Sequence, residues 1–137
     1  MSVGRAPQIG DVFAVHRPGA AALSGRVVST SAIVGPRHGC NLVYLYRTGS
    51  TLDLVDLLVP PMMTTRAPWS RRYFEFVRGE PLLPGDFFQR HCFRDARGRL
   101  YDEKSRPLDS PVGPVGQWRL YEEVEAIEGA IAGAFRA

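Results

Sequence analysis

Residues 57–77 of this chain read LLVPPMMTTRAPWSRRYFEFV and form its most distinctive segment. Proline has no backbone N–H, so Pro60 and Pro61 must stop or bend a strand that enters from Leu57. The residue before a proline is pushed toward extended geometry, which disfavours helix just ahead of each proline. The segment therefore predicts an ordered crossover between two strands, and Trp69 is the largest apolar side chain available to anchor it.

Length and composition indicate one globular domain spanning residues 1–137. Hydrophobic residues make up 45% of the chain and charged residues 23%, which is typical of a folded rather than a disordered protein. No apolar run approaches the length of a membrane span, and the opening residues lack the apolar core of a signal peptide. Two cysteines, Cys40 and Cys92, do not make a disulfide framework, so we expect a cytoplasmic protein with reduced thiols.

The charge is mildly basic and consists almost entirely of arginine. The formal net charge is +3, and Lys104 is the only lysine among 17 basic residues. Residues 120–137 hold four glutamates and one arginine, so the positive charge lies in the rest of the chain. Arginine suits contacts with carboxylates, phosphates and protein interfaces. The simpler explanation is a GC-rich genome that encodes arginine wherever a positive charge suffices.

The hydrophobic pattern of the first 77 residues is that of a β protein. Short β-branched or apolar runs bounded by turn residues predict strands at 12–15, 25–31, 41–46 and 73–77. The third of these is apolar on both faces, which favours a central position in the sheet. Residues 52–58 fit one or two helical turns or an edge strand, and the pattern does not separate these alternatives.

The second half of the chain predicts a hairpin between two loops. Residues 87–93 and 99–101 flank the turn Asp95–Gly98, in which glycine supplies the positive φ that such a turn requires. Residues 78–86 and 105–116 are rich in proline and glycine, and we interpret both as loops.

The end of the chain has the period of a helix rather than of a strand. Apolar residues recur at helical spacing, at Leu120, Val124, Ile127, Ile131 and Phe135. Two glycines, at 129 and 133, each weaken this helix by roughly 1 kcal/mol, so we expect them to allow close packing against another element. The predicted fold is mainly β (α+β): a strongly bent, mainly antiparallel sheet or a partly closed barrel with a C-terminal amphipathic helix.

Two groups of residues suggest metal chemistry without the spacing that it requires. His38, Cys40, His91 and Cys92 are possible zinc ligands, but H-x-C and H-C are not spacings of common zinc sites. Adjacent residues on a strand also point to opposite faces. We therefore predict no metal site and interpret these side chains as buried cysteines and ordinary histidines.

The second group resembles the carboxylate and lysine set of metal-dependent nucleases. Asp86 and the run Asp102-Glu103-Lys104 supply carboxylates for Mg²⁺ and a cation for a phosphate. Each piece lies beside a turn, where Asp and Lys are expected for turn geometry and solubility alone. A G-x-S-x-G elbow and a glycine-rich phosphate loop are both missing, and nothing selects a Cys–His pair. We predict no catalytic residue and no cofactor.

Basic and aromatic residues alternate within the crossover and form the candidate partner-binding set. The set comprises Arg66, Trp69, Arg71, Arg72 and Tyr73. Such residues stack on and neutralise nucleic acid, and they also dominate the binding energy of protein interfaces. For any single member, the simpler interpretation is a core tryptophan flanked by solvated arginines.

The order of these blocks resembles the immunity protein 26 family of bacterial polymorphic toxin systems. The resemblance runs from about Gly10 to Phe135. It rests on the GDVFAV and GRVV strands, the segment from Val59 to Phe74, the FRDxxGxxYDE hairpin and the final helix. The positions matched to the family are Asp11, Phe13, Trp69, Phe74, Phe93, Tyr101 and Asp102. The sequence departs from the pattern in the long 31–41 connection and at His16.

Membership of this family implies a mostly β protein that binds a cognate toxin and neutralises it without catalysis. The family has no catalytic residues to carry over, and the matched positions are ones that a fold alone can require. We therefore expect a bacterial, cytoplasmic immunity protein whose partner is a toxin protein. The alternative is a small β-barrel module that binds nucleic acid, which we rank second.

Overall fold

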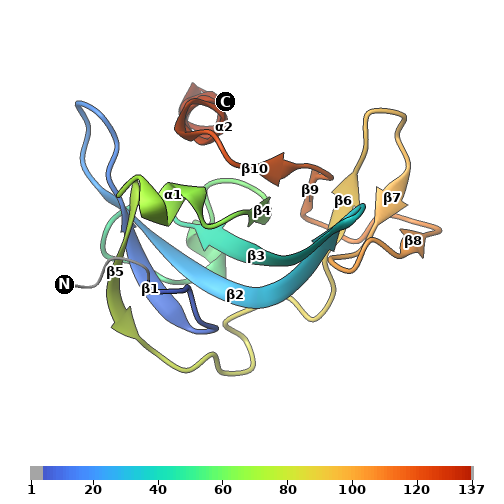
Figure 1. Cartoon of the computed structure of the whole chain (residues 1–137), viewed down its shortest axis with the longest axis horizontal. Coiled ribbons are helices and arrows are strands. Elements are labelled where there is room, and N and C mark those ends of the chain that lie inside the picture. The colour runs from blue at the N-terminus through green and yellow to red at the C-terminus, as the bar shows by residue number, and fades with distance from the viewer. Residues whose placement is uncertain (1–4, 137) are drawn as a thin grey trace.

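The computed structural model describes residues 5–136, with 37% of residues in strands and 15% in helices. Its larger sheet has six strands in the order β10–β4–β3–β2–β1–β5 (Figure 1). Neighbours are antiparallel except for the parallel pair of β4 and β10. The strands are β1 (Asp11–Val15), β2 (Leu23–Val34), β3 (Arg37–Leu45), β4 (Met62–Thr64), β5 (Phe74–Gly79) and β10 (Leu120–Tyr121). The mainly β, mainly antiparallel prediction is confirmed.

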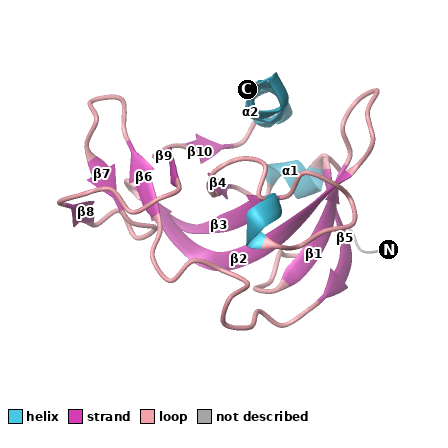
Figure 2. Ribbon diagram, turned by 180° about the vertical axis from the view of Figure 1, so that it is seen from behind, coloured by secondary structure: helices cyan, strands magenta, loops and turns pink. Residues whose placement is uncertain are grey.

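A smaller sheet lies at the end of the molecule opposite β1 and β5, as both ribbon views show (Figures 1 and 2). Its four strands follow the order β8–β7–β6–β9, and β6 and β9 are parallel. They are β6 (Cys92–Arg94), β7 (Leu100–Tyr101), β8 (Pro107–Leu108) and β9 (Val115–Gln117). The helical elements are the 3-10 helix η1 (Leu54–Asp56) and the α-helices α1 (Ala67–Ser70) and α2 (Val124–Arg136).

The larger sheet is strongly bent along β2 and β3, its two longest strands (Figure 2). Their pairing shifts register after Val27, again after Ser29 and again after Ala32. A register shift places extra backbone on one strand, which bends the strand and increases its twist. Within residues 5–136 the sheet remains open, with β10 and β5 as its edges, so the bent-sheet alternative describes the fold.

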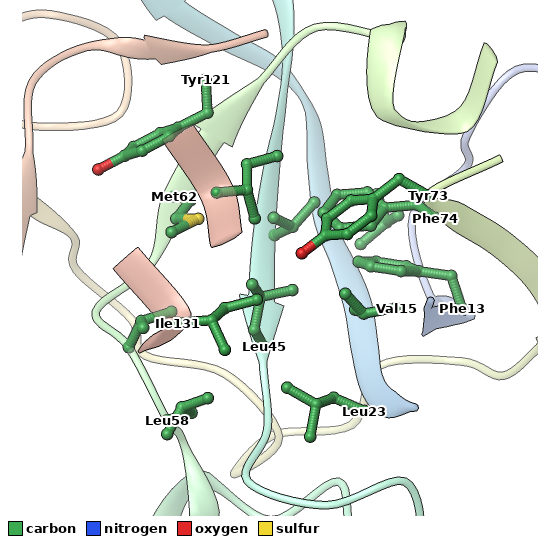
Figure 3. Packing of buried hydrophobic residues seen from close by; sticks show 14 residues of the cluster. Phe13, Val15, Leu23, Leu45, Leu58, Met62, Tyr73, Phe74, Tyr121 and Ile131 are labelled. Carbon is green, nitrogen blue, oxygen red and sulfur yellow. The ribbon is translucent and has the colours of Figure 1, made fainter. Parts of the chain in front are cut away.

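From Cys40 onward, β3 is buried on both faces and divides the apolar side chains into two clusters. Val43 and Leu45 pack with Phe13, Tyr121 and the helix α2 in the first cluster, part of which Figure 3 shows. Leu42 and Tyr44 point the other way, into a second cluster that includes Phe93 from the smaller sheet. This alternation is the two-residue period of a strand, and it confirms the central position that the apolar run predicts.

The C-terminal helix α2 buries Ile127 and Ile131 against the first cluster. The expectation that its glycines allow close packing is wrong. A Cβ placed on Gly129 or Gly133 meets no atom within 4 Å. The helix also begins at Val124 rather than at Leu120, which belongs to β10. Among the described residues, no helix is long and apolar enough to cross a membrane.

The structure differs from the predicted elements mainly in short strands. The crossover contains β4, and the expected 105–116 loop includes β8 and the start of β9. In the predicted strand 87–93 only the end, from Cys92, pairs in the sheet. Residues 54–56 form the 3-10 helix η1, and Leu57 then makes an isolated antiparallel bridge with Tyr46, so each alternative for 52–58 describes part of the segment. Strands of two or three residues contain too few side chains for a period to be recognised.

Candidate partner-binding surface

The predicted crossover ends in one turn of helix, α1, which leads the chain from β4 into β5. Pro68 occupies the first turn, where a missing backbone N–H disturbs no helical hydrogen bond. At the other end, the Arg72 N–H donates to the Trp69 carbonyl at 3.0 Å and the Tyr73 N–H donates to the Pro68 carbonyl at 2.9 Å. These two hydrogen bonds form a Schellman cap, which fixes the backbone after the helix.

Arg72 adopts the left-handed backbone conformation, with φ of 60°. Glycine is the usual residue at this position of a Schellman cap, because a side chain is strained there. Ser105 also has a left-handed φ, of 59°, but its side chain makes hydrogen bonds that hold the local structure. Its hydroxyl donates to the Ile33 carbonyl at 2.7 Å and accepts the Gly35 N–H at 3.2 Å and the Trp118 indole N–H at 3.0 Å.

The Arg72 side chain has no comparable structural role. It is exposed, as are Arg66 and Arg71 at the two ends of α1. Arg72 and Arg71 make no side-chain hydrogen bond or ion pair with any residue in the part of the chain that the structure describes. We call these three arginines the α1 corner. The strain at Arg72 is therefore not offset by a hydrogen bond or ion pair of its side chain within residues 5–136.

Trp69 is partly buried beneath the α1 corner and packs against the first core cluster. Its ring meets Phe13 at a centroid distance of 5.2 Å and Phe74 at 5.0 Å, edge-on in both cases. Edge-to-face pairs of this kind are stabilising. Trp69 thus holds the position predicted for an anchor of the crossover.

Tyr73, a member of the candidate partner-binding set, does not lie on the surface. It is only 4% exposed, and its hydroxyl donates a hydrogen bond to Glu128 on α2. Glu128 also accepts from the Arg17 guanidinium at 3.2 Å, so one carboxylate joins α2 to the ends of β1 and α1. Burial and this carboxylate both raise the pKa of Tyr73. The sequence does not indicate these contacts, because Glu128 is far from both partners along the chain.

A buried polar chain joins the two sheets at the other end of the molecule. The Tyr44 hydroxyl lies 2.7 Å from His91 Nε2 and accepts the Phe88 N–H at 3.0 Å. His91 Nδ1 faces Glu103 Oε1 at 3.5 Å, an ion-pair distance without a hydrogen bond. The facing imidazole lowers the pKa of Glu103. Tyr44 is fully buried and burial raises its pKa, so it is neither an accessible nor an activated nucleophile.

The residues considered as zinc ligands are not gathered into one site. His38 is exposed on β3, whereas Cys40, His91 and Cys92 are buried. Burial raises the pKa of the Cys40 thiol, which disfavours the thiolate that zinc requires. Within residues 5–136, no three His, Cys, Asp or Glu side chains are placed to hold a metal ion.

The carboxylates and lysine of the nuclease-like set are engaged in turns and loop contacts. Asp86 accepts the Leu83 N–H at 2.8 Å. Asp102 is partly buried, yet the N–H groups of Arg106 and Lys104 and the Arg106 guanidinium lower its pKa. The Lys104 ammonium donates to the carbonyl and the hydroxyl of one serine on β2, at 2.7 and 2.8 Å. Turn hydrogen bonds thus engage the two aspartates, and a contact with β2 engages the lysine.

A surface groove of about 590 Å³ lies between the β6–β7 turn and the link from β9 to β10. Arg94 and Arg119 line it together with Trp118 and with Asp95, whose carboxylate is held by the turn. Trp118 stacks on Tyr101 at a centroid distance of 4.8 Å. Tyr101 thus covers one face of the indole, and the charged side chains of the groove are two arginines and one aspartate.

Comparison with known proteins identifies no relative of this chain: no family model, no curated protein and no solved structure matches it significantly.

Proposed function

We propose that this protein is a bacterial immunity protein that acts in the cytoplasm, where it binds a cognate toxin and neutralises it by occlusion, without catalysis. The resemblance of its sequence blocks to the immunity protein 26 family supports this proposal. The observation that carries it is the exposed, left-handed Arg72 of the α1 corner.

Arg72 supports a binding role because strain at a position without internal compensation points to function. Glycine would fit this backbone with less strain, yet the position holds a long cationic side chain that makes no hydrogen bond or ion pair within residues 5–136. Codon bias toward arginine explains a surface arginine at a relaxed position more easily than one at a strained position. Arginine is also among the residues that contribute most to interface energy.

A protein partner fits the α1 corner better than nucleic acid does. Nucleic-acid interfaces of this type combine cations with exposed aromatic faces on which bases stack. Here Trp69 packs edge-on against two phenylalanines, and Tyr73 is buried under α2. The corner thus offers guanidinium groups without an open aromatic platform, which favours an acidic protein surface.

The direct test is co-expression with the toxin domain encoded beside this gene. We expect the wild-type protein to restore growth and to co-purify with the toxin as a complex. Affinity for a well-packed protein interface should fall only modestly between low and high salt, whereas binding to nucleic acid falls steeply. Failure to protect against any neighbouring toxin would overturn the proposal, and steeply salt-dependent binding of single strands would favour the alternative module.

Arg72→Gly should separate stability from binding. Glycine relieves the left-handed strain at the expense of a more flexible unfolded chain, so we expect a net gain of about 0.5–1 kcal/mol and a rise in melting temperature of roughly 2–4 °C. The free energy of toxin binding should weaken by about 2 kcal/mol, the loss typical of truncating an interface arginine. Thermal unfolding and calorimetric titration measure the two effects.

Two variants serve as controls for Arg72→Gly. Ser105→Gly, at the other left-handed position, should destabilise the protein because three hydrogen bonds of its hydroxyl are lost. Arg97→Glu reverses an exposed charge on the distant β6–β7 turn and should leave toxin affinity unchanged. Undiminished toxin affinity in Arg72→Gly would place the interface elsewhere.

A further inference from the structure

The turn that carries Arg72 needs support from outside α1. The helix α1 is a single turn of four residues, and a helix this short is not stable by itself. The turn ends in the left-handed conformation of Arg72, in which a Cβ is unfavourable. A strained backbone of this kind persists only where the surrounding structure fixes it. Contacts outside the turn must therefore hold it in place.

Tyr73, the residue after Arg72, supplies such contacts. Its N–H is part of the Schellman cap, and its carbonyl accepts the His16 N–H at 2.8 Å. Its ring is buried and stacks on Phe74 at a centroid distance of 5.4 Å. Its hydroxyl points toward α2 and donates to Glu128 (Figure 3). The position of the Tyr73 side chain therefore depends on a residue of α2.

The Glu128 carboxylate is itself held in place. The Arg17 guanidinium, in the link from β1 to β2, donates to both carboxylate oxygens at 3.2 Å. The side chains of Arg17 and Glu128 are only 16% and 22% exposed, so salt screens this ion pair little. Glu128 also lies next to Ile127 and about one turn before Ile131, the two residues that bury α2 in the first cluster. The carboxylate thus has a fixed position with respect to the core.

The Tyr73 hydroxyl couples this carboxylate to the cap. Among the described residues, Glu128 is the sole hydrogen-bond partner of the hydroxyl. Loss of the acceptor would leave a buried hydroxyl unpaired, which is unfavourable. Tyr73 would then regain a partner only by moving toward water. Because its backbone N–H closes the cap, such a movement would disturb the backbone of Arg72.

We propose that Glu128 is a positioning residue for the α1 corner: through the Tyr73 hydroxyl, it holds Arg72 in the conformation that binds the toxin. This inference rests on the proposed function and adds a residue of α2 that controls toxin affinity. The effect passes from Glu128 to Tyr73 and from Tyr73 to the cap, so Glu128 acts without touching the toxin. Arg17 supports Glu128 by fixing its carboxylate.

Amide hydrogen exchange in the free protein, measured by NMR, tests the first step. The Arg72 and Tyr73 amides make the two hydrogen bonds of the cap. In Glu128→Leu, which has no acceptor, we expect both amides to exchange at least about tenfold faster than in the wild type. Glu128→Gln keeps an oxygen that can accept from the Tyr73 hydroxyl, so its rates should stay within about threefold of the wild type. Unchanged exchange in Glu128→Leu would overturn the inference, whatever the toxin affinity.

Ile131→Val separates this effect from a general loss of stability. It loosens the packing of α2 and should lower the melting temperature while leaving the Glu128 carboxylate in place. The cap amides should exchange at the wild-type rate, and toxin affinity should not change. Faster exchange of the cap amides in Ile131→Val would attribute the effect to the docking of α2 as a whole and overturn the specific role of Glu128.

Calorimetric titration with the toxin domain encoded beside the gene tests the second step. We expect Glu128→Leu to bind the toxin about tenfold more weakly than the wild type, and Glu128→Gln to bind it within about threefold of the wild type. Faster exchange of the cap with unchanged toxin affinity would overturn control of binding by Glu128 and leave the immunity function standing. Absence of binding by the wild type overturns the function, and the inference with it.

The same substitution in an Arg72→Gly background shows whether Glu128 acts through Arg72. Glycine adopts the left-handed conformation without strain, and it presents no guanidinium to be positioned. The loss of affinity caused by Glu128→Leu should therefore shrink to about threefold or less. An undiminished loss would mean that Glu128 contacts the toxin itself, which would overturn its assignment as a positioning residue.

Discussion

Trp69→Ala should lower the free energy of unfolding by about 3 kcal/mol. This value lies near the lower end of the range for truncating a large aromatic side chain, because Trp69 is only partly buried. The loss arises because the indole closes one side of the first cluster, edge-on against Phe13 and Phe74. Truncation leaves a cavity beneath α1 and removes two aromatic pairs. Chemical denaturation monitored by circular dichroism measures the effect.

Trp69→Phe is the control for this substitution. It keeps an aromatic ring at the same place and should lose clearly less stability than alanine, because less volume is removed. Unchanged stability in Trp69→Ala would mean that the indole contributes nothing to the core. Its role would then have to be sought in the partner interface.

Gly25→Ala should destabilise the protein to a similar extent, lowering the free energy of unfolding by about 3 kcal/mol. Gly25 lies on β2 directly opposite Phe13, and a Cβ at this position would overlap the Phe13 ring. The ring cannot easily move aside, because Phe74 lies 4.4 Å from it and Trp69 covers another side. The absence of a side chain at Gly25 is therefore a packing requirement. Urea denaturation of the purified variant measures the loss.

Two further variants test this explanation of Gly25→Ala. Gly79→Ala, on β5, should be nearly neutral, since the nearest atom to an added Cβ is Asp11 Oδ1 at 4.0 Å. Combining Gly25→Ala with Phe13→Leu should cost less than the sum of the single losses, because the smaller side chain relieves the overlap. Strictly additive losses would show that the two residues do not compete for the same space.

Elements with several periodic side chains could be predicted from the sequence, and elements defined by distant pairing could not. The apolar run at β3 predicts a central strand, and the helical period of Ile127 and Ile131 predicts α2. In contrast, β4 follows two prolines and is a strand only because it lies between β3 and β10. Its partner on one side comes from the end of the chain, which no local pattern reveals.

The candidate site was predictable to a similar extent. The mixed arginine and aromatic composition identifies the segment around α1, but it does not separate exposed from buried members. Tyr73 is buried where Glu128 of α2 accepts a hydrogen bond from its hydroxyl, a contact between residues 55 positions apart in the sequence. The left-handed conformation of Arg72 follows from the Schellman cap, and arginine gives no signal for such a position as glycine would.

The Schellman cap of α1 has a consequence for how the protein can evolve. Its two hydrogen bonds join backbone atoms only, so neither the Arg71 nor the Arg72 side chain is needed to make them. Both side chains are exposed, whereas Trp69 and Tyr73 beside them hold the turn to the core. Mutation can therefore alter the proposed binding surface while the scaffold beneath it is inherited unchanged. Under the proposed function, lineages that diverge at these two positions would keep one fold and acquire different partners.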